Sequence, residues 1–234
     1  MPTHRLDRII AGSGLYSRTE ATGLIRLGHV AVDGGKAMSG SEKYDPENVS
    51  ITVDGEKLEY KAFRYIMMNK PRGYVTSTGD AREKTVMQLL DERYSKLGLF
   101  PAGRLDKDAE GFLLLTNDGD FAHKVITPSK KVAKRYFVKT DGSISDFDIE
   151  AFSRGLTLND GTKCLSASLE PTSSGALITL YEGKYHQVKR MMSAIGKPVT
   201  YLKRIAIGGL DLDEDMAPGQ YRELGDEINS IFDE

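Results

Sequence analysis

A short segment near the middle of the chain constrains the fold more than any other feature. Residues Phe112–Thr116 form a continuous apolar run, which predicts a strand buried in a sheet. Asn117-Asp118-Gly119 closes this strand, because these residue types favour turns. Just before the strand stands Gly103-Arg104-Leu105-Asp106, which puts a basic and an acidic side chain in one loop. The chain must therefore build a sheet around an apolar strand whose leading loop carries charge.

Local signals elsewhere predict both helices and strands. Ser17-Arg18-Thr19-Glu20 is a capping box, so a helix begins at Arg18, and Gly28 suits its end. Val30-Ala31-Val32 followed by Asp33-Gly34 predicts a strand that enters a tight turn. We expect further strands at 49–53, 57–60, 65–68, 135–139, 165–169 and 176–181, and helices at 85–94 and 185–195. The mixture predicts an α+β fold with two domains, at 1–62 and 63–234.

The composition favours a soluble globular protein. Hydrophobic residues make up 39% of the chain and charged residues 28%. No apolar run approaches the roughly 18 residues that a membrane span needs, and the N-terminus lacks a signal-peptide pattern. Cys164 is the single cysteine and cannot form an internal disulfide. We expect a cytoplasmic protein that has no membrane partner and is a monomer.

The net charge of -2 conceals segments of opposite sign. Residues 207–234 hold nine acids and one base, a charge of -8, which leaves +6 on the other 206 residues. Residues 124–139 contain six bases and no acid, and residues 180–206 contain six bases and one acid. Such segments can make a phosphate-binding surface, although charge runs are also common on plain solvated faces.

The sequence offers few residues for catalysis. The four histidines are far apart, so no metal pattern exists, and neither a phosphate-binding loop nor a dinucleotide fingerprint is present. Asp106 remains as the candidate. A carboxyl group with a pKa of about 3.9 is ionised at neutral pH and can act as a nucleophile or base. From spacing alone, a loop aspartate that caps a turn or pairs with Arg104 is the favoured explanation, because most such pairs are structural.

Several motifs together resemble one family. Gly103–Gly119 (GRLDKDAEGFLLLTNDG) resembles the central motif of the RsuA-type ribosomal RNA pseudouridine synthases. Five further segments resemble family motifs in the same order, namely Asn69–Tyr74, Lys134-Arg135-Tyr136, Glu182–Gly196, Arg204–Gly209 and Pro218–Arg222. The N-terminal RLDRIIAGSGLYSRTEATGLIRLGHVAVDG resembles an S4 RNA-binding domain. The resemblance implies a small αL-like S4 domain and a catalytic domain on a mixed, mainly antiparallel sheet flanked by helices.

The resemblance also implies roles for particular residues. Asp106 matches the catalytic aspartate, and Tyr136 matches the tyrosine that stacks on the target base. Lys189 stands where the family has a basic residue paired with the aspartate, and Val188 stands at the apolar position beneath the base. Without the resemblance, Tyr136 and Val188 would be interpreted as packing residues and Lys189 as a solvated helix residue.

The implied reaction uses no cofactor, because the detached uracil is held, rotated and rejoined through C5. The carboxylate of Asp106 can attack C1′, add at C6 or abstract the 2′ proton, and the sequence does not choose among these routes. One departure from the family is Ala109, where a threonine is common, and another is Phe112 in place of leucine. A hydroxyl that anchors the loop would be missing at Ala109, but we expect activity to survive.

The remaining candidates are RNA contacts. In the catalytic domain these are Arg104, Lys184, His186, Gln187, Arg190, Asn69, Lys70 and Arg72, and in the S4 domain Arg5, Arg8, Arg18 and Arg26, with His29 beside them. Plain surface charge is the alternative explanation for Lys70, Arg72 and Lys184. The sequence His186–Arg190 resembles the enzymes of the small subunit, so we expect a uridine of 16S ribosomal RNA, free or in an assembling subunit, to be the substrate. The alternatives are the same chemistry on 23S RNA, or a catalytically silent RNA-binding assembly factor.

Overall fold

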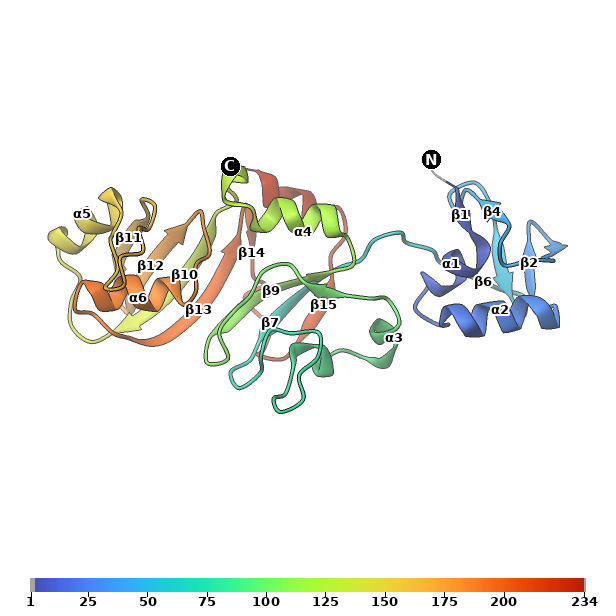
Figure 1. The fold of residues 1–234 in the computed structure, drawn as a ribbon, viewed down its shortest axis with the longest axis horizontal. Coiled ribbons are helices and arrows are strands. Elements are labelled where there is room, and N and C mark those ends of the chain that lie inside the picture. Colours follow the sequence, from blue (N-terminus) through green and yellow to red (C-terminus); the bar gives the residue numbers. More distant parts are fainter. Residues whose placement is uncertain (1–2, 234) are drawn as a thin grey trace. The chain divides into compact units, whose positions relative to one another are not determined.

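The computed structural model describes residues 3–233, which form two compact units (Figure 1). The first contains the chain up to Arg64 together with Leu90–Leu99, and the second contains Tyr65–Leu89 and the chain from Phe100 onward. Within residues 3–233 none of the helices combines the length and the apolar composition that a membrane crossing requires. We describe each unit by itself.

The first unit packs short helices against small sheets. Its helices are α1 (Leu6–Ala11), α2 (Arg18–Leu27) and α3 (Glu92–Ser95), and its strands are β1 (His4–Arg5), β2 (Val30–Val32), β3 (Gly35–Lys36), β4 (Lys43–Tyr44), β5 (Ile51–Val53) and β6 (Glu56–Lys57). The capping box is present, because the Ser17 hydroxyl accepts from the Glu20 amide while the Glu20 carboxylate accepts from the Ser17 amide. Gly28 ends α2 in the left-handed conformation, as predicted. Leu6, Ile9 and Ile25 lie in the core.

The second unit is built on a mixed, mainly antiparallel sheet, which confirms the predicted fold class. The strands along the sheet are, in order, β11 (Ser168–Thr172), β12 (Gly175–Leu180), β10 (Lys134–Thr140), β13 (Val199–Ile207), β9 (Glu110–Thr116), β7 (Tyr65–Lys70) and β15 (Tyr221–Glu223), with β8 (Phe100–Pro101) beside β9 and β14 (Leu210–Asp211) beside β13. The pair β13–β9 is parallel.

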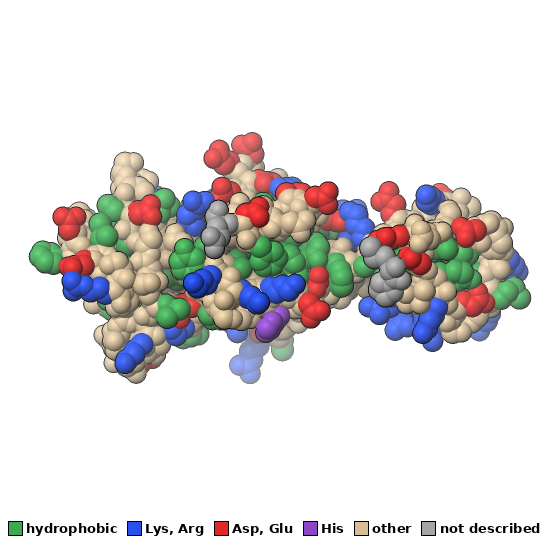
Figure 2. Space-filling view, turned by 90° about the horizontal axis from the view of Figure 1, so that it is seen from above, with side chains coloured by type: hydrophobic (Ala, Val, Ile, Leu, Met, Phe, Trp, Pro, Cys, Tyr) green, Lys and Arg blue, Asp and Glu red, His purple; other side chains and the backbone are tan. Residues whose placement is uncertain are grey.

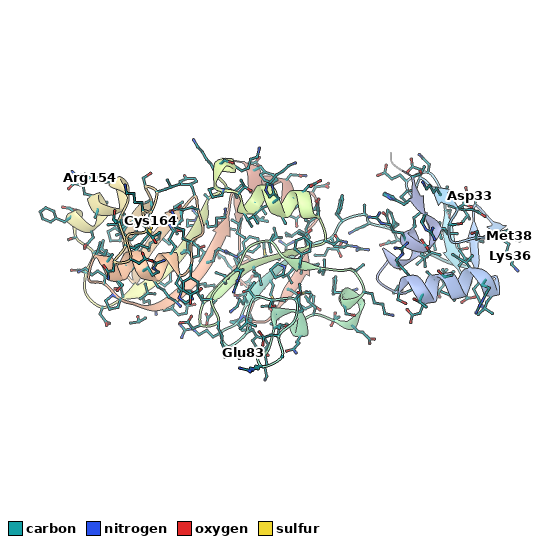
Figure 3. The ribbon with its side chains drawn as sticks, viewed as in Figure 1. Asp33, Lys36, Met38, Glu83, Arg154 and Cys164 are labelled. Atoms are coloured by element: carbon teal, nitrogen blue, oxygen red, sulfur yellow. The ribbon has the colours of Figure 1, made fainter. Side chains whose placement is uncertain are left out.

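Helices cover the sheet at both ends (Figure 1). These are α4 (Gly119–Ile126), α5 (Asp146–Arg154) and α6 (Gln187–Ala194), with shorter helices η1 (Val86–Leu89), η2 (Pro128–Lys130) and η3 (Asp226–Phe232). Strand β9 is buried on both faces, because Phe112 and Leu114 pack against α4 and η3 while Leu113 and Leu115 are also fully buried. At the other end, α5 packs against β11, and Cys164 is a free, buried thiol in that part of the unit (Figure 3).

The structure corrects several predicted elements. The helix expected at 85–94 is interrupted, because η1 ends at Leu89 and a separate short helix, α3, begins after Asp91. Helices α4 and α5 were not predicted, although Asp118 and Ser145 cap them. Strand β13 was also not predicted, and β11 begins three residues later than expected.

Candidate active site

Asp106 lies in the loop between β8 and β9. Hydrogen bonds to the loop backbone fix it on one side, here called the inner side, which faces Gly73 and Thr76. The Thr76 hydroxyl donates to the Leu105 carbonyl (2.8 Å) and accepts from the Leu105 amide (3.2 Å). The Gly73 amide donates to the Lys107 carbonyl (2.8 Å). Because the residues on both sides of Asp106 are held, the position of its carboxylate is fixed by the loop backbone.

Lys70 also holds the inner side of this loop. Its side chain is fully buried, and the ammonium donates to the carbonyls of Pro71 (3.0 Å) and Ala109 (2.9 Å) and approaches that of Lys107 (3.4 Å). Burial lowers the pKa of Lys70 to about 8, although Asp108, Asp106 and Glu110 favour its charged form. Ala109 is therefore anchored through its backbone without the threonine hydroxyl common in the family.

The outer side of the loop faces the first turn of α6. The Lys189 ammonium lies 3.0 Å from Asp106 Oδ2 and donates to Asp108 Oδ1 at 2.5 Å. His186 Nε2 lies 3.4 Å from Asp106 Oδ1. Burial lowers the pKa of Lys189, but the hydrogen bonds to Asp108 and Asp106 outweigh it and raise the pKa above its ordinary value. Asp106 is 21% exposed, so its carboxylate is accessible from outside.

A buried polar network builds the turn that carries His186. The buried Glu182 carboxylate accepts from the Leu165 amide (2.9 Å) and the Gln187 side-chain amide (2.6 Å), and pairs with Lys184. The Gln187 side-chain oxygen in turn accepts from the Lys184 amide (2.8 Å). His186 then occupies the N-cap position of α6 in the left-handed conformation, with φ of 48°. The network orients both His186 and Lys189 towards the aspartate loop.

Tyr136 and Val188 are buried, at 8% and 5% exposure. Tyr136 lies on β10 opposite Arg204 of β13, and Arg204 lies opposite Gly111 of β9. Only glycine fits at position 111, because its φ is 103° and a Cβ would lie 2.1 Å from the Arg204 carbonyl oxygen. This close approach packs β13 against β9, the strand that leaves the Asp106 loop. Because β13 also pairs with β10, it connects Tyr136 to the same part of the sheet.

Three of the predicted RNA contacts have buried side chains with protein partners, so their contact with RNA stays a prediction. Lys70 holds the aspartate loop, and Gln187 belongs to the Glu182 network. Asn69 is 1% exposed and donates to the Met216 carbonyl at 2.6 Å. Lys134, in one of the two basic segments, is also buried and donates to the carbonyls of Val125 and Val132. In this structure these polar groups hold backbone turns.

The other candidates are accessible to different degrees. Arg72 pairs with Glu110 at 3.3 Å and lies over the Tyr201 ring, and Arg190 pairs with Asp160 at 2.5 Å. Arg104 is exposed, and the loop is held by Thr76 and Lys70. In the first unit Arg5, Arg8, Arg18 and Arg26 are all exposed, although Arg5 and Arg18 share Asp7. The face in Figure 2 carries basic and acidic side chains intermingled in both units.

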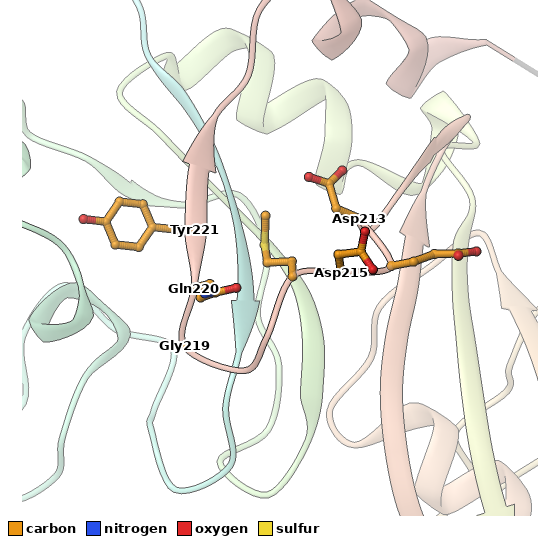
Figure 4. Close-up of a pocket in the computed structure, with 7 residues that line it drawn as sticks. Asp213, Asp215, Gly219, Gln220 and Tyr221 are labelled. Atoms are coloured by element: carbon orange, nitrogen blue, oxygen red, sulfur yellow. The ribbon is translucent and has the colours of Figure 1, made fainter.

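One cavity is lined by acidic residues and does not include Asp106. It has a volume of about 660 Å³ and is lined by residues from Asp213 to Tyr221 (Figure 4). Hydrogen bonds and the charge of Arg222 lower the pKa of Asp213 despite partial burial, so the lining is anionic at neutral pH. Such a lining repels phosphate and does not suit RNA. In residues 3–233, no group of three or more His, Cys, Asp or Glu side chains could hold a metal ion.

Comparisons with known proteins agree with this fold. Residues 64–194 match the RNA pseudouridylate synthase family and residues 4–49 match the S4 domain. The chain is 44% identical over 235 residues to a Bacillus subtilis protein named as an uncharacterized RNA pseudouridine synthase, covering 98% of each. It is 41% identical over 226 residues to the ribosomal small subunit pseudouridine synthase A of Escherichia coli, covering 95% of this chain and 97% of that one. A crystal structure of a pseudouridylate synthase, 34% identical, superimposes with a TM-score of 0.68 over 97% of this chain and 99% of that one.

The mixed sheet and the N-terminal S4 domain thus define an RNA-modifying isomerase. The chain belongs to the RNA pseudouridine synthase family, and its relatives assign it to the RsuA type.

Proposed function

We propose that the protein converts one uridine of 16S ribosomal RNA to pseudouridine and that Asp106 supplies the reacting carboxylate. The observation that carries the proposal is the ion pair of Asp106 with Lys189 at 3.0 Å, on a loop whose backbone is held by Thr76 and Lys70. The 16S substrate is favoured by the 41% identity to a small subunit enzyme over nearly the whole chain.

The reaction is an isomerisation that needs no added group. The N1–C1′ bond breaks, the uracil rotates, and a C5–C1′ bond forms while the C5 proton is lost and N1 is protonated. An ionised Asp106 serves each of the three possible routes, by bonding to C1′, adding to C6 or removing the 2′ proton. Lys189 keeps the carboxylate oriented through its charge, because Lys189 itself remains protonated.

Tyr136 and Val188 would hold the flipped uracil. A tyrosine ring stacks on a base for about 1–3 kcal/mol, and the uridine has to leave its helix before C5 can be reached. Both side chains are buried in the present structure, so a uracil that contacts them would lie in apolar surroundings. The apolar environment would strengthen the interaction between Asp106 and Lys189.

RNA would be bound by exposed and half-buried basic side chains of both domains, taken as 1–62 and 63–234. Candidates in the S4 domain are Arg5, Arg8, Arg18 and Arg26, and in the catalytic domain Arg72, Arg104, Lys184, His186 and Arg190. The partner is 16S RNA or an assembling small subunit in the cytoplasm, and the protein acts as a monomer. The acidic segment 207–234 would limit nonspecific RNA binding, because its charge repels phosphate.

Mapping pseudouridine on ribosomal RNA tests this function. The protein is incubated with 16S and 23S transcripts and with assembly intermediates, and pseudouridines are located by carbodiimide-dependent stops of reverse transcriptase. We expect one stop on 16S RNA. A stop on 23S RNA alone would overturn the substrate, and no stop on any RNA would support a silent RNA-binding factor.

A further inference from the structure

Helix α6 presents two different surfaces, which lie on either side of its buried face. Lys189 faces the Asp106 loop. Arg190 and Ser193, which are three residues apart and so lie on one side of the helix, line a separate cavity. Tyr185 precedes the helix and lines the same cavity. The proposed reaction uses the side of α6 that carries Lys189, and it assigns no role to the cavity on the other side.

Tyr185 is a large aromatic side chain that the fold leaves open. It is 76% exposed, although burying an aromatic ring would stabilise the protein. Its ring stacks on His186 with ring centroids 3.8 Å apart and an interplanar angle of 18°. Neighbouring side chains in an extended chain point to opposite sides, and the left-handed conformation of His186 allows this stack. That conformation is sparsely populated for residues other than glycine, and such strain is often found at functional sites.

The cavity beside Tyr185 has the size and lining of a nucleobase site. Its volume of about 350 Å³ is in the range of small-ligand pockets. Its lining combines an apolar side chain and an aromatic ring with groups that can read a base edge, and consists of Leu158, Asn159, Asp160, Tyr185, Arg190 and Ser193. Arg190 is held in place by Asp160 (2.5 Å) and by the Tyr185 carbonyl (3.3 Å). Because Asp160 offsets the charge of Arg190, the lining does not favour a phosphate, and the oxygens of Asp160 can also accept from the amino or imino group of a base.

We propose that Tyr185 and this cavity bind an unpaired nucleobase of the substrate RNA, from a nucleotide next to the target uridine. The proposal rests on the proposed function and adds a second base-binding site to it. Tyr185 supplies the stacking face for the base. Asn159, Asp160 and Ser193 supply hydrogen bonds to its edge.

The geometry indicates a nucleotide close to the target. The Tyr185 ring stacks directly on His186, whose Nε2 lies 3.4 Å from the carboxylate of Asp106. A base on the outer face of Tyr185 would therefore be separated from the reacting centre by two stacked rings. A neighbouring nucleotide can span this distance, so occupying the site would help to keep the target uridine out of its stack.

Paired substitutions in protein and RNA test the site. The RNA is the shortest ribosomal RNA fragment that the wild-type protein modifies or, if none is modified, the shortest that it binds. Dissociation constants are measured for wild type, Tyr185→Ala and Tyr185→Phe, on intact RNA and on RNAs with an abasic nucleotide at each position flanking the target or, for a fragment that is only bound, at each unpaired position. The matched control is Phe147→Ala, because Phe147 is 83% exposed on α5 and does not line the cavity.

We expect Tyr185→Ala to weaken binding by about 5- to 150-fold, the range for loss of one stacked base. Tyr185→Phe should bind almost as wild type, and Phe147→Ala should have no effect. At one abasic position Tyr185→Ala should cause no further loss. Equal effects of Tyr185→Ala and Phe147→Ala, or losses that add at every abasic position, would overturn the site. Absence of binding to any ribosomal fragment would overturn it too. Binding without modification, with the expected coupling, would refute the proposed function alone.

Discussion

The inner and outer sides of the Asp106 loop are held by different chemistry. On the inner side Lys70 and Thr76 contact backbone groups, and the lysine is fully buried. On the outer side Lys189 and His186 approach the carboxylate itself and remain partly exposed. The pKa of Lys70 is lowered to about 8, whereas the pKa of Lys189 is raised. A lysine beside the same loop can therefore hold the loop backbone or pair with its carboxylates, depending on whether it meets carbonyls or a carboxylate.

Removing the carboxylate itself should have the largest effect on activity and little effect on folding. Asp106→Asn keeps the shape of the side chain but removes the charge and the reacting oxygen. Loss of a reacting residue lowers turnover by about 10⁴-fold or more. Pseudouridine formation on the RNA that wild type modifies measures this loss, and the thermal midpoint checks the fold. Activity within tenfold of wild type would show that another group performs the reaction.

Substitution on the outer side should reduce activity more than stability. In Lys189→Met the Asp106 carboxylate loses its close cation and its orientation. We expect turnover to fall by about 100-fold, the scale for misplacing a reacting group by an ångström, with little change in the midpoint of urea unfolding. Lys189→Arg keeps the charge and should recover much of the loss. Equal activity of the two variants would show that the charge at position 189 does not matter.

Substitution on the inner side should reduce stability more than turnover. Lys70→Met leaves buried carbonyls without their donor, and we expect a loss of about 2 kcal/mol in the free energy of unfolding at pH 7. Urea unfolding measures this loss, with turnover determined on the folded fraction. The matched control is Lys107→Met, because Lys107 is exposed on the same loop and pairs with Glu83 (labelled in Figure 3) at 2.6 Å.

The pH dependence distinguishes the inner lysine independently. Its pKa is about 8 in the folded protein and about 10.4 when unfolded. Between these values the unfolded chain retains a proton that the folded chain has lost, so raising the pH stabilises the fold. Relative to Lys70→Met, wild type should gain about 2 kcal/mol between pH 8 and pH 10. A difference between the two proteins that stays constant with pH would contradict the lowered pKa of Lys70.

The smallest expected effect on the inner side belongs to Thr76. Thr76→Val keeps the shape of the side chain but removes both hydrogen bonds to Leu105. The expected loss of stability is about 1–2 kcal/mol, visible as a lower thermal midpoint. Thr200→Val is the control, because that hydroxyl makes one exposed hydrogen bond to the Lys139 carbonyl. A shift in Thr76→Val no larger than in the control would indicate that the loop does not depend on Thr76.

Features with local signals were predictable from the sequence. The capping box of α2, the apolar strand β9 and the Asp106 motif all depend on residues close together in the chain. Helix α5 also carries a local signal, the capping box at Ser145 and Asp148, so its start is equally predictable. Strand β13 was hidden because Arg204 occupies an inward position, where its side chain donates to the Phe112 carbonyl (2.7 Å).

Burial of polar side chains was not predictable. Asn69, Lys70 and Gln187 were expected on the surface because polar residues normally are. Each is buried because it meets backbone or carboxylate groups from a distant part of the chain or from a folded turn. The role of Thr76 was not predictable for the same reason, because its partner Leu105 is 29 residues away and no motif joins them.

The left-handed conformation of His186 has a consequence for the evolution of this position. Glycine adopts this backbone without the cost of about 1–2 kcal/mol that a side chain brings. The same change would delete the ring between Tyr185 and Asp106. Directed evolution for thermal tolerance alone should therefore enrich glycine at position 186. Selection for RNA modification should retain histidine, so the two selections favour different residues at the same position.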